Sequence, residues 1–557
     1  MRADLPLLTP CQVRGSLLAG REIALVDVRE EDPYAQAHPL FAVQLSAARI
    51  ELDAPWRLPR RDVVVVVYAD GPADNLPEGL AATAARKLQA LGYTQVFLLA
   101  GGLAGWRDGN LLGAAGASTD ERGELFRDVN VPSKAFGELV AHERHTPSLP
   151  AEAVKALQDS GADVVVLDVR RFDEFQTMCI PGGTSVPGAE LLLHVRDLAP
   201  DPRTQVIVNC AGRTRSIIGT QSLVNAGIPN PVAALRNGTI GWLLAGQALA
   251  HGQTRRFGPV SVAAQLAVRE STQALAERAG ALRLDTAGLA AWAAETQRTL
   301  YRWDVRTPEE YAAGHLPGFG SAPGGQLVQE TDVFAAVRGA RIVLADGGQS
   351  TDGVRAAMTA HWLAQMGWTV AWLTDTTPAQ CTATGPWLPT QAAAPEVARV
   401  TTLQLAGQLL SGRCLLIDLG TSAQYASAHI PGAAWALRVQ LPQVLPEALR
   451  QRPEVEQIVL TCGVGALSCF AAADVQVLTG LPVAVLAGGN AAWSALGQPM
   501  ETGETRLLSP RSDRYRRPYE GTSAPREAMQ GYLDWEFGLV DQLARDGTHG
   551  FKVLPAR

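Results

Sequence analysis

The feature that most constrains the fold of this chain is a unit of strand, loop and helix that recurs four times. Each copy opens with a short apolar strand ending in aspartate, then adds a second apolar strand, a helical stretch closed by glycine, and a third strand. The aspartates are Asp27, Asp168, Asp304 and Asp418, and the glycines are Gly92, Gly227, Gly367 and Gly480. Glycine is the usual residue just past a helix end. Agreement at several spaced points indicates that one unit was copied four times.

The alternation of strands and helices predicts an α/β fold. Each copy should form a small, mainly parallel sheet with helices on both faces, and a site in such a sheet lies beyond the carboxyl ends of the strands. A chain of 557 residues is too long for one hydrophobic core, because domains average about 150 residues. We predict domains at residues 1–112, 128–256, 258–388 and 396–505.

The remaining segment, residues 506–557, matches none of the copies. It is polar and arginine-rich at first, and between Pro525 and Gly547 apolar residues recur at helical spacing. This stripe consists of Met529, Tyr532, Leu533, Leu539, Val540 and Leu543. We expect a partly helical tail that packs across the domains as a strap; a contact in a homodimer is the alternative.

Composition excludes several classes of function. The net charge of −7 without a basic tract argues against nucleic acid as a partner, and no apolar window is long enough for a membrane span. The N-terminus has no signal-peptide core. The seven cysteines are scattered without a CxxC pair, which predicts a reducing compartment, the cytoplasm, rather than disulfides or a zinc ribbon. His142 and His145 lack a third ligand nearby, so we expect a solvated linker helix there and no metal site.

One loop concentrates chemistry. An apolar strand ends at Cys210, and the loop after it carries Gly212, Arg213 and Arg215 before a helix begins near Ser216. Such a turn points backbone N–H groups inward, and the helix N-terminus adds positive potential. Together with two arginines these surroundings should lower the pKa of the thiol, so a thiolate is expected at neutral pH.

This loop resembles that of the rhodanese domain, in which cysteine is followed by four residues, arginine, and then serine or threonine. Cys210, Arg215 and Ser216 match this pattern in full. The family's entry motif is matched by Asp168, Arg170, Glu174, Phe175, Ile180, Pro181 and Gly182, while Cys179 stands where histidine is usual. Arg170 and Glu174, four residues apart, are expected to form a structural ion pair. The resemblance covers about residues 1–505, so the chain is similar to four tandem rhodanese-like domains followed by the tail.

The resemblance implies a sulfurtransferase. Such an enzyme moves sulfane sulfur from thiosulfate or a similar donor to a thiophilic acceptor, cyanide in vitro, through a persulfide on Cys210. The resemblance assigns catalysis to Cys210 and Arg215, and substrate binding to Ala211, Gly212, Arg213, Thr214 and Ser216. Two half-reactions on one cysteine imply ping-pong kinetics. The partners are then a small-molecule donor and acceptor, and no cofactor is expected.

The other copies depart from this loop. The first and third have Asp70 and Asp346 where the positive cradle would be, so both are expected to be inactive and structural. The fourth keeps Cys462 but has Leu467 in place of the arginine. Backbone amides there still favour a thiolate, but a dianionic donor loses a contact worth roughly 1.5–3 kcal/mol. We regard Cys462 as a second, degenerate site.

Two other functions stay open. A cysteine-dependent phosphatase of related fold has five residues between cysteine and arginine, whereas four lie between Cys210 and Arg215. A non-catalytic sulfide carrier or scaffold is favoured by the two copies without cysteine. Two-domain members of the family use the inactive partner to form the cleft. By that resemblance the first copy should cover Cys210, and residues 1–256 alone should keep substantial turnover.

Overall fold

The computed structural model describes residues 5–108, 123–347, 353–521 and 523–556. They form four sheets of five strands each, and every pair of neighbouring strands is parallel. All four sheets share one order: β1-β5-β4-β2-β3 in the first domain and its equivalents in the others. The predicted α/β fold of four tandem domains is confirmed.

In the first domain the strands are β1 (Leu7–Leu8), β2 (Ile23–Asp27), β3 (Ala42–Gln44), β4 (Val64–Tyr68) and β5 (Val96–Leu99). Its helices are α1 (Pro10–Leu18), α2 (Glu31–Gln36), α3 (Ile50–Arg57), α4 (Leu80–Ala90) and α5 (Gly102–Asp108). In the second domain the strands are β6 (Ser148–Leu149), β7 (Val164–Asp168), β8 (Thr184–Ser185), β9 (Gln205–Asn209) and β10 (Val232–Leu235). Its helices are α6 (Val131–Arg144), α7 (Ala151–Asp159), α8 (Phe172–Thr177), α9 (Leu191–Leu198), α10 (Thr214–Ala226) and α11 (Gly238–Leu244).

In the third domain the strands are β11 (Leu282–Leu284), β12 (Leu300–Asp304), β13 (Gly320–Ser321), β14 (Arg341–Ala345) and β15 (Thr369–Leu373). Its helices are α12 (Val262–Arg278), α13 (Thr286–Ala294), α14 (Pro308–Ala313), α15 (Gly324–Gln329), α16 (Thr331–Phe334) and α17 (Val354–Gln365). In the fourth domain the strands are β16 (Arg399–Val400), β17 (Cys414–Asp418), β18 (Ala434–Trp435), β19 (Gln457–Thr461) and β20 (Val483–Leu486). Its helices are α18 (Thr402–Ser411), α19 (Ser422–Ser427), α20 (Leu441–Gln451), α21 (Ala466–Thr479) and α22 (Gly489–Ala495).

Helices cover both faces of each sheet because successive strand residues point to opposite sides. In the fourth domain, Leu415 and Ile417 of β17 pack in one core with α20 and α21. Leu416, between them, packs in a second core that contains Leu405 of α18 and Trp493 of α22. Strands buried on both faces read as unbroken apolar runs, which is the pattern that the sequence shows.

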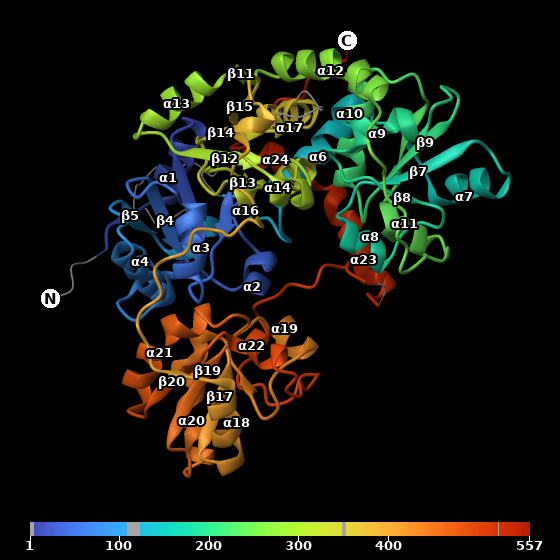
Figure 1. Ribbon diagram of the computed structural model, residues 1–557. Coiled ribbons are helices and arrows are strands. Elements are labelled where there is room, and N and C mark those ends of the chain that lie inside the picture. The colour runs from blue at the N-terminus through green and yellow to red at the C-terminus, as the bar shows by residue number, and fades with distance from the viewer. Residues whose placement is uncertain (1–4, 109–122, 348–352, 522, 557) are drawn as a thin grey trace.

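The four domains pack against one another and do not form a linear array. The first three, with the tail, form one body, and the fourth lies below it in the view (Figure 1). The fourth packs on α3 of the first domain through Leu52 and the ion pair of Arg438 with Glu51. Gly188 of the second domain and Gly325 of the third meet closely, because a Cβ on Gly325 would lie 3.0 Å from the backbone nitrogen of Gly188. Buried residues of all three domains belong to one continuous core.

Helix α6 lies at the centre of this body. Its Phe136 and Val140 are fully buried, and α6 packs on α10 so tightly that a Cβ on Gly137 would lie 2.8 Å from Cγ2 of Thr214. Only the far end of α6, at His142 and His145, is exposed. The expectation of a solvated linker helix is therefore right for that end alone.

The tail forms the predicted strap. It contains α23 (Arg526–Phe537) and α24 (Leu539–Asp546), and both pack against α6. Met529, Tyr532 and Leu533 pack against Ile240 of α11, and Leu539 and Leu543 join the central core. Beyond α24, the backbone N–H of Lys552 donates to the carbonyl of Gln365 in the third domain. Near its start, the carbonyls of Ser512 and Arg506 accept from the N–H groups of Asp32 in the first domain and Trp435 in the fourth. The tail thus contacts all four domains.

Candidate active site

Cys210 lies directly after β9, at the carboxyl end of a central strand, and α10 starts four residues later. Its Sγ donates a hydrogen bond to Oγ of Ser216 at 3.4 Å. The start of α11 holds the loop from the other side, since the N–H groups of Thr239 and Ile240 donate to the carbonyls of Cys210 and Ala211. Gly238 is needed there, because its φ is +55° and a Cβ would lie 2.3 Å from the Cys210 carbonyl oxygen.

Both loop arginines are held by carboxylates. Arg215 makes two hydrogen bonds of 2.8 Å to Glu174, which lies in α8. Arg213 makes two to Glu138 of α6, at 2.6 and 2.7 Å, and stacks on the ring of Phe537. Burial opposes ionisation of Glu174, but the Arg215 guanidinium outweighs it and lowers the pKa of Glu174 to about 2. The loop's positive charge is thus balanced before any ligand arrives.

The motif residue Arg170 does not pair with Glu174, although the four-residue spacing in the sequence suggested that ion pair. Arg170 binds Asp168 at 2.8 Å and the carbonyl of Met178 at 2.6 Å. It thereby ties the end of β7 to the turn after α8, and Glu174 is free to hold Arg215. Asp168 and Arg170 are two residues apart at the end of β7, so their side chains lie on the same side of the chain and pair with each other.

The expectation of a lowered pKa for Cys210 is wrong for this arrangement. Burial raises the pKa of the thiol, and Arg215 and the hydrogen bond to Ser216 only partly oppose it. The side chain is 2% exposed, and the arginines expected to stabilise a thiolate are neutralised by Glu138 and Glu174. Desolvation disfavours the charged form of a buried thiol in such surroundings.

The expected cover of the loop is also different. A small cavity of about 20 Å³ over Cys210 is lined by Lys134 of α6, Gln329 of α15 and Tyr519, Tyr532 and Glu536 of the tail. No described residue of the first domain lines it. Helix α23 lies so close that a Cβ on Gly212 would be 3.2 Å from Cε1 of Tyr532. The second domain's site is closed by α6, the third domain and the tail.

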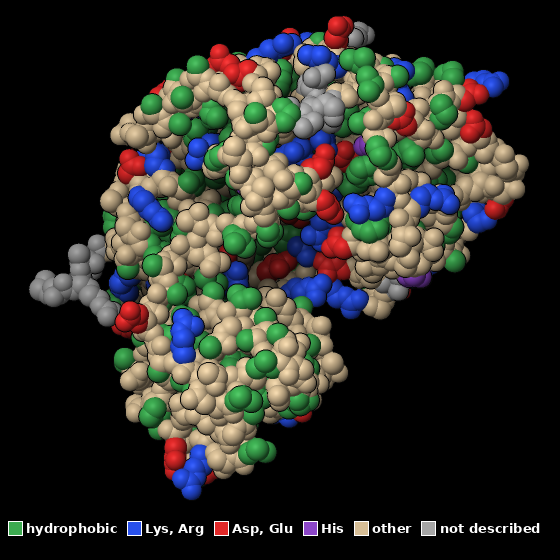
Figure 2. All heavy atoms as spheres, in the orientation of Figure 1, with side chains coloured by type: hydrophobic (Ala, Val, Ile, Leu, Met, Phe, Trp, Pro, Cys, Tyr) green, Lys and Arg blue, Asp and Glu red, His purple; other side chains and the backbone are tan. Residues whose placement is uncertain are grey.

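A larger cavity of about 530 Å³ adjoins this closed site. Arg215, Gln329 and Tyr519 line both spaces. Its other charged lining residues are Arg170, Arg171, Asp173, Glu174, Glu330, Arg514, Arg517 and Glu520. A hollow with basic and acidic side chains on its walls is also visible between the domains in Figure 2. This cavity offers a charged approach to the Cys210 loop.

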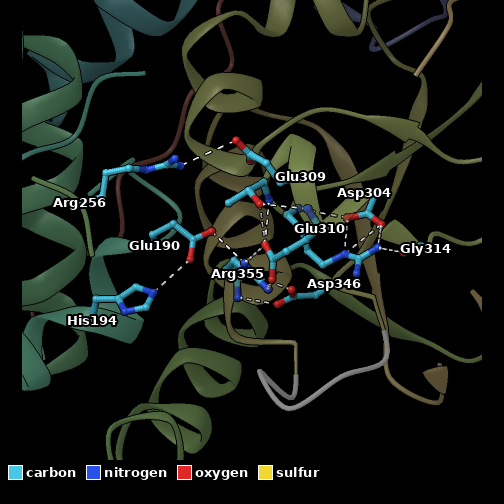
Figure 3. Close-up of polar contacts among 11 residues, drawn as sticks. Glu190, His194, Arg256, Asp304, Glu309, Glu310, Gly314, Asp346 and Arg355 are labelled. Atoms are coloured by element: carbon cyan, nitrogen blue, oxygen red, sulfur yellow. Dashed lines mark hydrogen bonds and ion pairs between the residues drawn. The ribbon is translucent and has the colours of Figure 1, made fainter. Parts of the chain in front are cut away.

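In the third domain a carboxylate occupies the corresponding loop. Arg355 donates to Asp346 at 2.8 Å and to both oxygens of Glu310 (Figure 3). The contact with Glu310 corresponds to that of Arg215 with Glu174 in the second domain. Arg355 also donates to Glu190 of the second domain at 2.9 Å. In the first domain Asp70 similarly accepts from Arg29 at 2.7 Å. These carboxylates already fill the positions near the arginines; that both loops are inactive stays a prediction.

The fourth domain keeps the loop shape without the arginine. Cys462 follows β19 and is 5% exposed, and the N–H of Asn490 donates to its carbonyl at 3.0 Å. Val464, in the same loop, is 72% exposed. Leu467 is buried and supplies no charge, so this position does not provide the cation that Arg215 provides at the Cys210 site.

Several residues of the site were not assigned from the sequence. Glu138, Tyr532 and Glu536 had no signal, because no local spacing connects them with Cys210. Glu174 was recognised as part of the motif but given the wrong partner. In the described part of the chain no group of three or more metal-ligating side chains occurs, and no described helix is long and apolar enough to cross a membrane.

Comparisons with known proteins agree with the fold. The family described as rhodanese-like domain matches residues 14–108, 150–245 and 401–496. The crystal structure of a thiosulfate sulfurtransferase from Pseudomonas aeruginosa is 60% identical, covers 99% of this chain and 100% of its own, and superposes with a TM-score of 0.93. The chain belongs to the rhodanese-like family.

Single-domain structures match parts of the chain. A rhodanese-like domain protein from Staphylococcus aureus is 22% identical over 19% of this chain and 100% of its own, with a TM-score of 0.17. A protein from Rhodopseudomonas palustris described as a possible tyrosine phosphatase is 25% identical over 19% of this chain and 85% of its own, with a TM-score of 0.16. A search of curated proteins gave no significant match.

Proposed function

We propose that this protein is a thiosulfate sulfurtransferase whose nucleophile is Cys210. The observation that carries this proposal is the loop itself. Among the four loops, only this one combines a cysteine with Arg213 and Arg215, and it lies beside a charged cavity large enough for a small donor. The Pseudomonas relative supports the same activity, since it is described as a thiosulfate sulfurtransferase and the match covers its whole length.

The chemistry follows from these positions. The donor enters through the 530 Å³ cavity and meets Arg215, whose guanidinium has five N–H donors, of which Glu174 takes two. The Cys210 thiolate attacks the outer sulfur of thiosulfate, the S–S bond of thiosulfate breaks, and sulfite leaves with the bonding electron pair. A persulfide anion remains on Cys210, and the loop N–H groups stabilise it.

The second half-reaction regenerates the enzyme. An acceptor such as cyanide attacks the terminal sulfur of the persulfide, thiocyanate leaves, and the electron pair of the S–S bond returns to Cys210. Burial disfavours the Cys210 thiolate. Hydrogen bonds from the loop N–H groups to a negatively charged sulfur offset this cost, and they therefore favour both half-reactions.

The experiment that tests this proposal is to map the persulfide. The full chain is treated with one equivalent of thiosulfate, and its peptides are analysed for the mass of one added sulfur atom. We expect that mass on the peptide with Cys210 and not on the peptide with Cys462. Loading on neither cysteine would overturn the proposed activity, and phosphate release from an aryl phosphate without loading would favour the phosphatase.

We further propose that the protein works in the cytoplasm with small-molecule partners. All seven cysteines are free thiols, and none forms a disulfide. Cys210, Cys462 and Cys469 are among the buried ones. Free thiols in this number are typical of a reducing compartment.

We predict that the tail protects the persulfide. In a variant without residues 523–557, Tyr532 and Glu536 are missing and the loop faces water, so added dithiothreitol should remove sulfur from Cys210 several-fold faster than in the full chain. The measurement is persulfide lifetime by cyanolysis after loading. Residues 1–256 should lose sulfur equally fast, in contrast to the expectation from two-domain relatives.

Deleting the tail also exposes the apolar side of α6, so a second variant is needed that keeps the packing of α24. Tyr532→Ser opens the cover over Gly212 with the chain intact. Its persulfide should also be lost faster, while exposed Gln530→Ser on the same helix should behave as wild type. Equal lifetimes in all variants would show that the tail does not cover the site.

A further inference from the structure

A buried carboxyl group with an unused oxygen faces the Cys210 loop. Glu536 of α23 is fully buried, and Tyr532 donates a hydrogen bond to its Oε1 at 2.8 Å. Its Oε2 has no hydrogen-bond partner among the described residues. Buried polar atoms nearly always have a partner, and one left without is costly. An atom of this kind therefore indicates a ligand or a function.

The unused oxygen points at the loop that carries the nucleophile. A Cβ on Gly212 would lie 3.4 Å from Oε2 of Glu536. Glu536 and Cys210 line the same cavity of about 20 Å³, which has room for roughly one small polar group. An oxygen atom of a donor bound at Cys210 would occupy this space, within reach of Oε2.

The charges around Glu536 decide its protonation. Burial and the neighbouring Glu138 raise its pKa, and Lys134, Tyr532 and Arg213 only partly oppose them, so the pKa of Glu536 is about 8. Lys134 is itself bound to Asp128 at 2.5 Å, which weakens its effect. At neutral pH most molecules therefore carry a proton on this carboxyl group, and Oε2 is then a donor without an acceptor.

We propose that Glu536 is a substrate-binding residue of the Cys210 site, and that its protonated carboxyl donates a hydrogen bond from Oε2 to an anionic oxygen of the sulfur donor. This inference rests on the proposed sulfur transfer and adds a residue that the loop motif does not contain. The arginines of the loop are engaged by Glu138 and Glu174, so the tail supplies a free donor at the place where negative charge arrives. An ionised Glu536 would instead repel both the donor and the thiolate.

A particular pH dependence follows. The reactive state has a proton on Glu536 and none on Cys210, so its population rises as the thiol ionises. Above about pH 8, Glu536 and Cys210 together hold a single proton. The share of molecules with that proton on Glu536 and a thiolate at Cys210 then no longer increases with pH. The logarithm of the loading rate should thus rise with pH and become flat near the pKa of Glu536. Glu536→Gln keeps an N–H donor and cannot ionise, so its rate should continue to rise.

The test is single-turnover loading of the full-length chain with thiosulfate, followed from about pH 6 to about pH 10. We expect the bend near pH 8 in wild type and in the exposed control Glu527→Gln. In Glu536→Gln the rate should level off only at the higher pH where the thiol itself ionises, and it should overtake wild type at high pH. Glu536→Ala, which offers no donor, should load roughly tenfold more slowly at neutral pH. A bend in Glu536→Gln at the wild-type pH would overturn the proposal.

A second measurement separates this inference from the proposed function. Methyl methanethiosulfonate, a small neutral reagent, reacts with the Cys210 thiolate without any anionic donor. In Glu536→Gln the thiolate should form at lower pH than in wild type, because a nearby negative charge has been removed. No change in this profile would show that Glu536 does not face the loop. If wild type reacts as expected with the reagent but does not load from thiosulfate, the proposed function fails instead.

Discussion

Cys210→Ser should abolish thiosulfate-dependent thiocyanate formation, with a loss of at least roughly a thousandfold, because the nucleophile carries both half-reactions. A serine hydroxyl is a poor nucleophile toward sulfur, and burial disfavours its ionisation even more than that of the thiol. The measurement is thiocyanate formed per minute by the full-length variants. Neighbouring loop contacts, such as the carbonyl that accepts from Thr239, are unchanged by the substitution.

Cys462→Ser is the matched control, because it removes the cysteine that follows the equivalent strand of the fourth domain. That loop lacks the arginine and lies outside the cavity over Cys210, so the loss should be no more than about twofold. Equal losses from the two substitutions would mean that sulfur passes through both cysteines and would overturn the assignment of a single site.

Arg215→Leu should be the second most damaging substitution. It copies the fourth domain's Leu467 and removes a cation from the place where a dianionic donor binds. A charge-assisted contact of about 1.5–3 kcal/mol corresponds to roughly ten- to a hundredfold slower loading from thiosulfate. Sulfur already present on Cys210 should still pass to cyanide at nearly the wild-type rate. The measurement is single-turnover loading and single-turnover transfer, followed separately.

The control for this substitution concerns Glu174, which loses its partner when Arg215 is removed. Leaving this partly buried carboxylate, 24% exposed, without a partner is costly, and the loss of the guanidinium would raise the pKa of Glu174 from its value of about 2. The double variant Arg215→Leu, Glu174→Gln removes both charges and should restore stability toward thermal unfolding but not loading. Recovery of loading in the double variant would show that Arg215 only balances Glu174.

The candidate site is a composite of near and distant parts of the chain. Cys210, Arg215 and Ser216 come from one strand-to-helix loop, whereas Glu138, Gln329 and Glu536 come from three other segments. An isolated second domain would therefore contain the loop and Glu138 but lack Gln329 and Glu536, which line the cavity over Cys210. The third domain, whose own loop carries Asp346, contributes Gln329 to the cavity over Cys210 and holds the second domain through Arg355 and Glu190.

The sequence alone determined the repeat, the parallel sheets and the loop that carries Cys210. Each depends on local order: strands buried on both faces are unbroken apolar runs, helices end at glycines such as Gly227, and Cys210 and Arg215 are only five positions apart. Interactions over a few residues are specified by neighbours along the chain, so they can be predicted from one sequence.

Only the tertiary structure decided how the loop is covered and charged. The partner of Arg215 is Glu174 rather than the solvent, the cover is α6 with the tail rather than the first domain, and burial raises the pKa of Cys210 rather than lowering it. These properties depend on the solvent excluded by all segments together and on charges brought from far along the chain. The desolvation of a group depends on every atom that surrounds it in space. Residues 210 and 536 become neighbours only when the whole chain has folded.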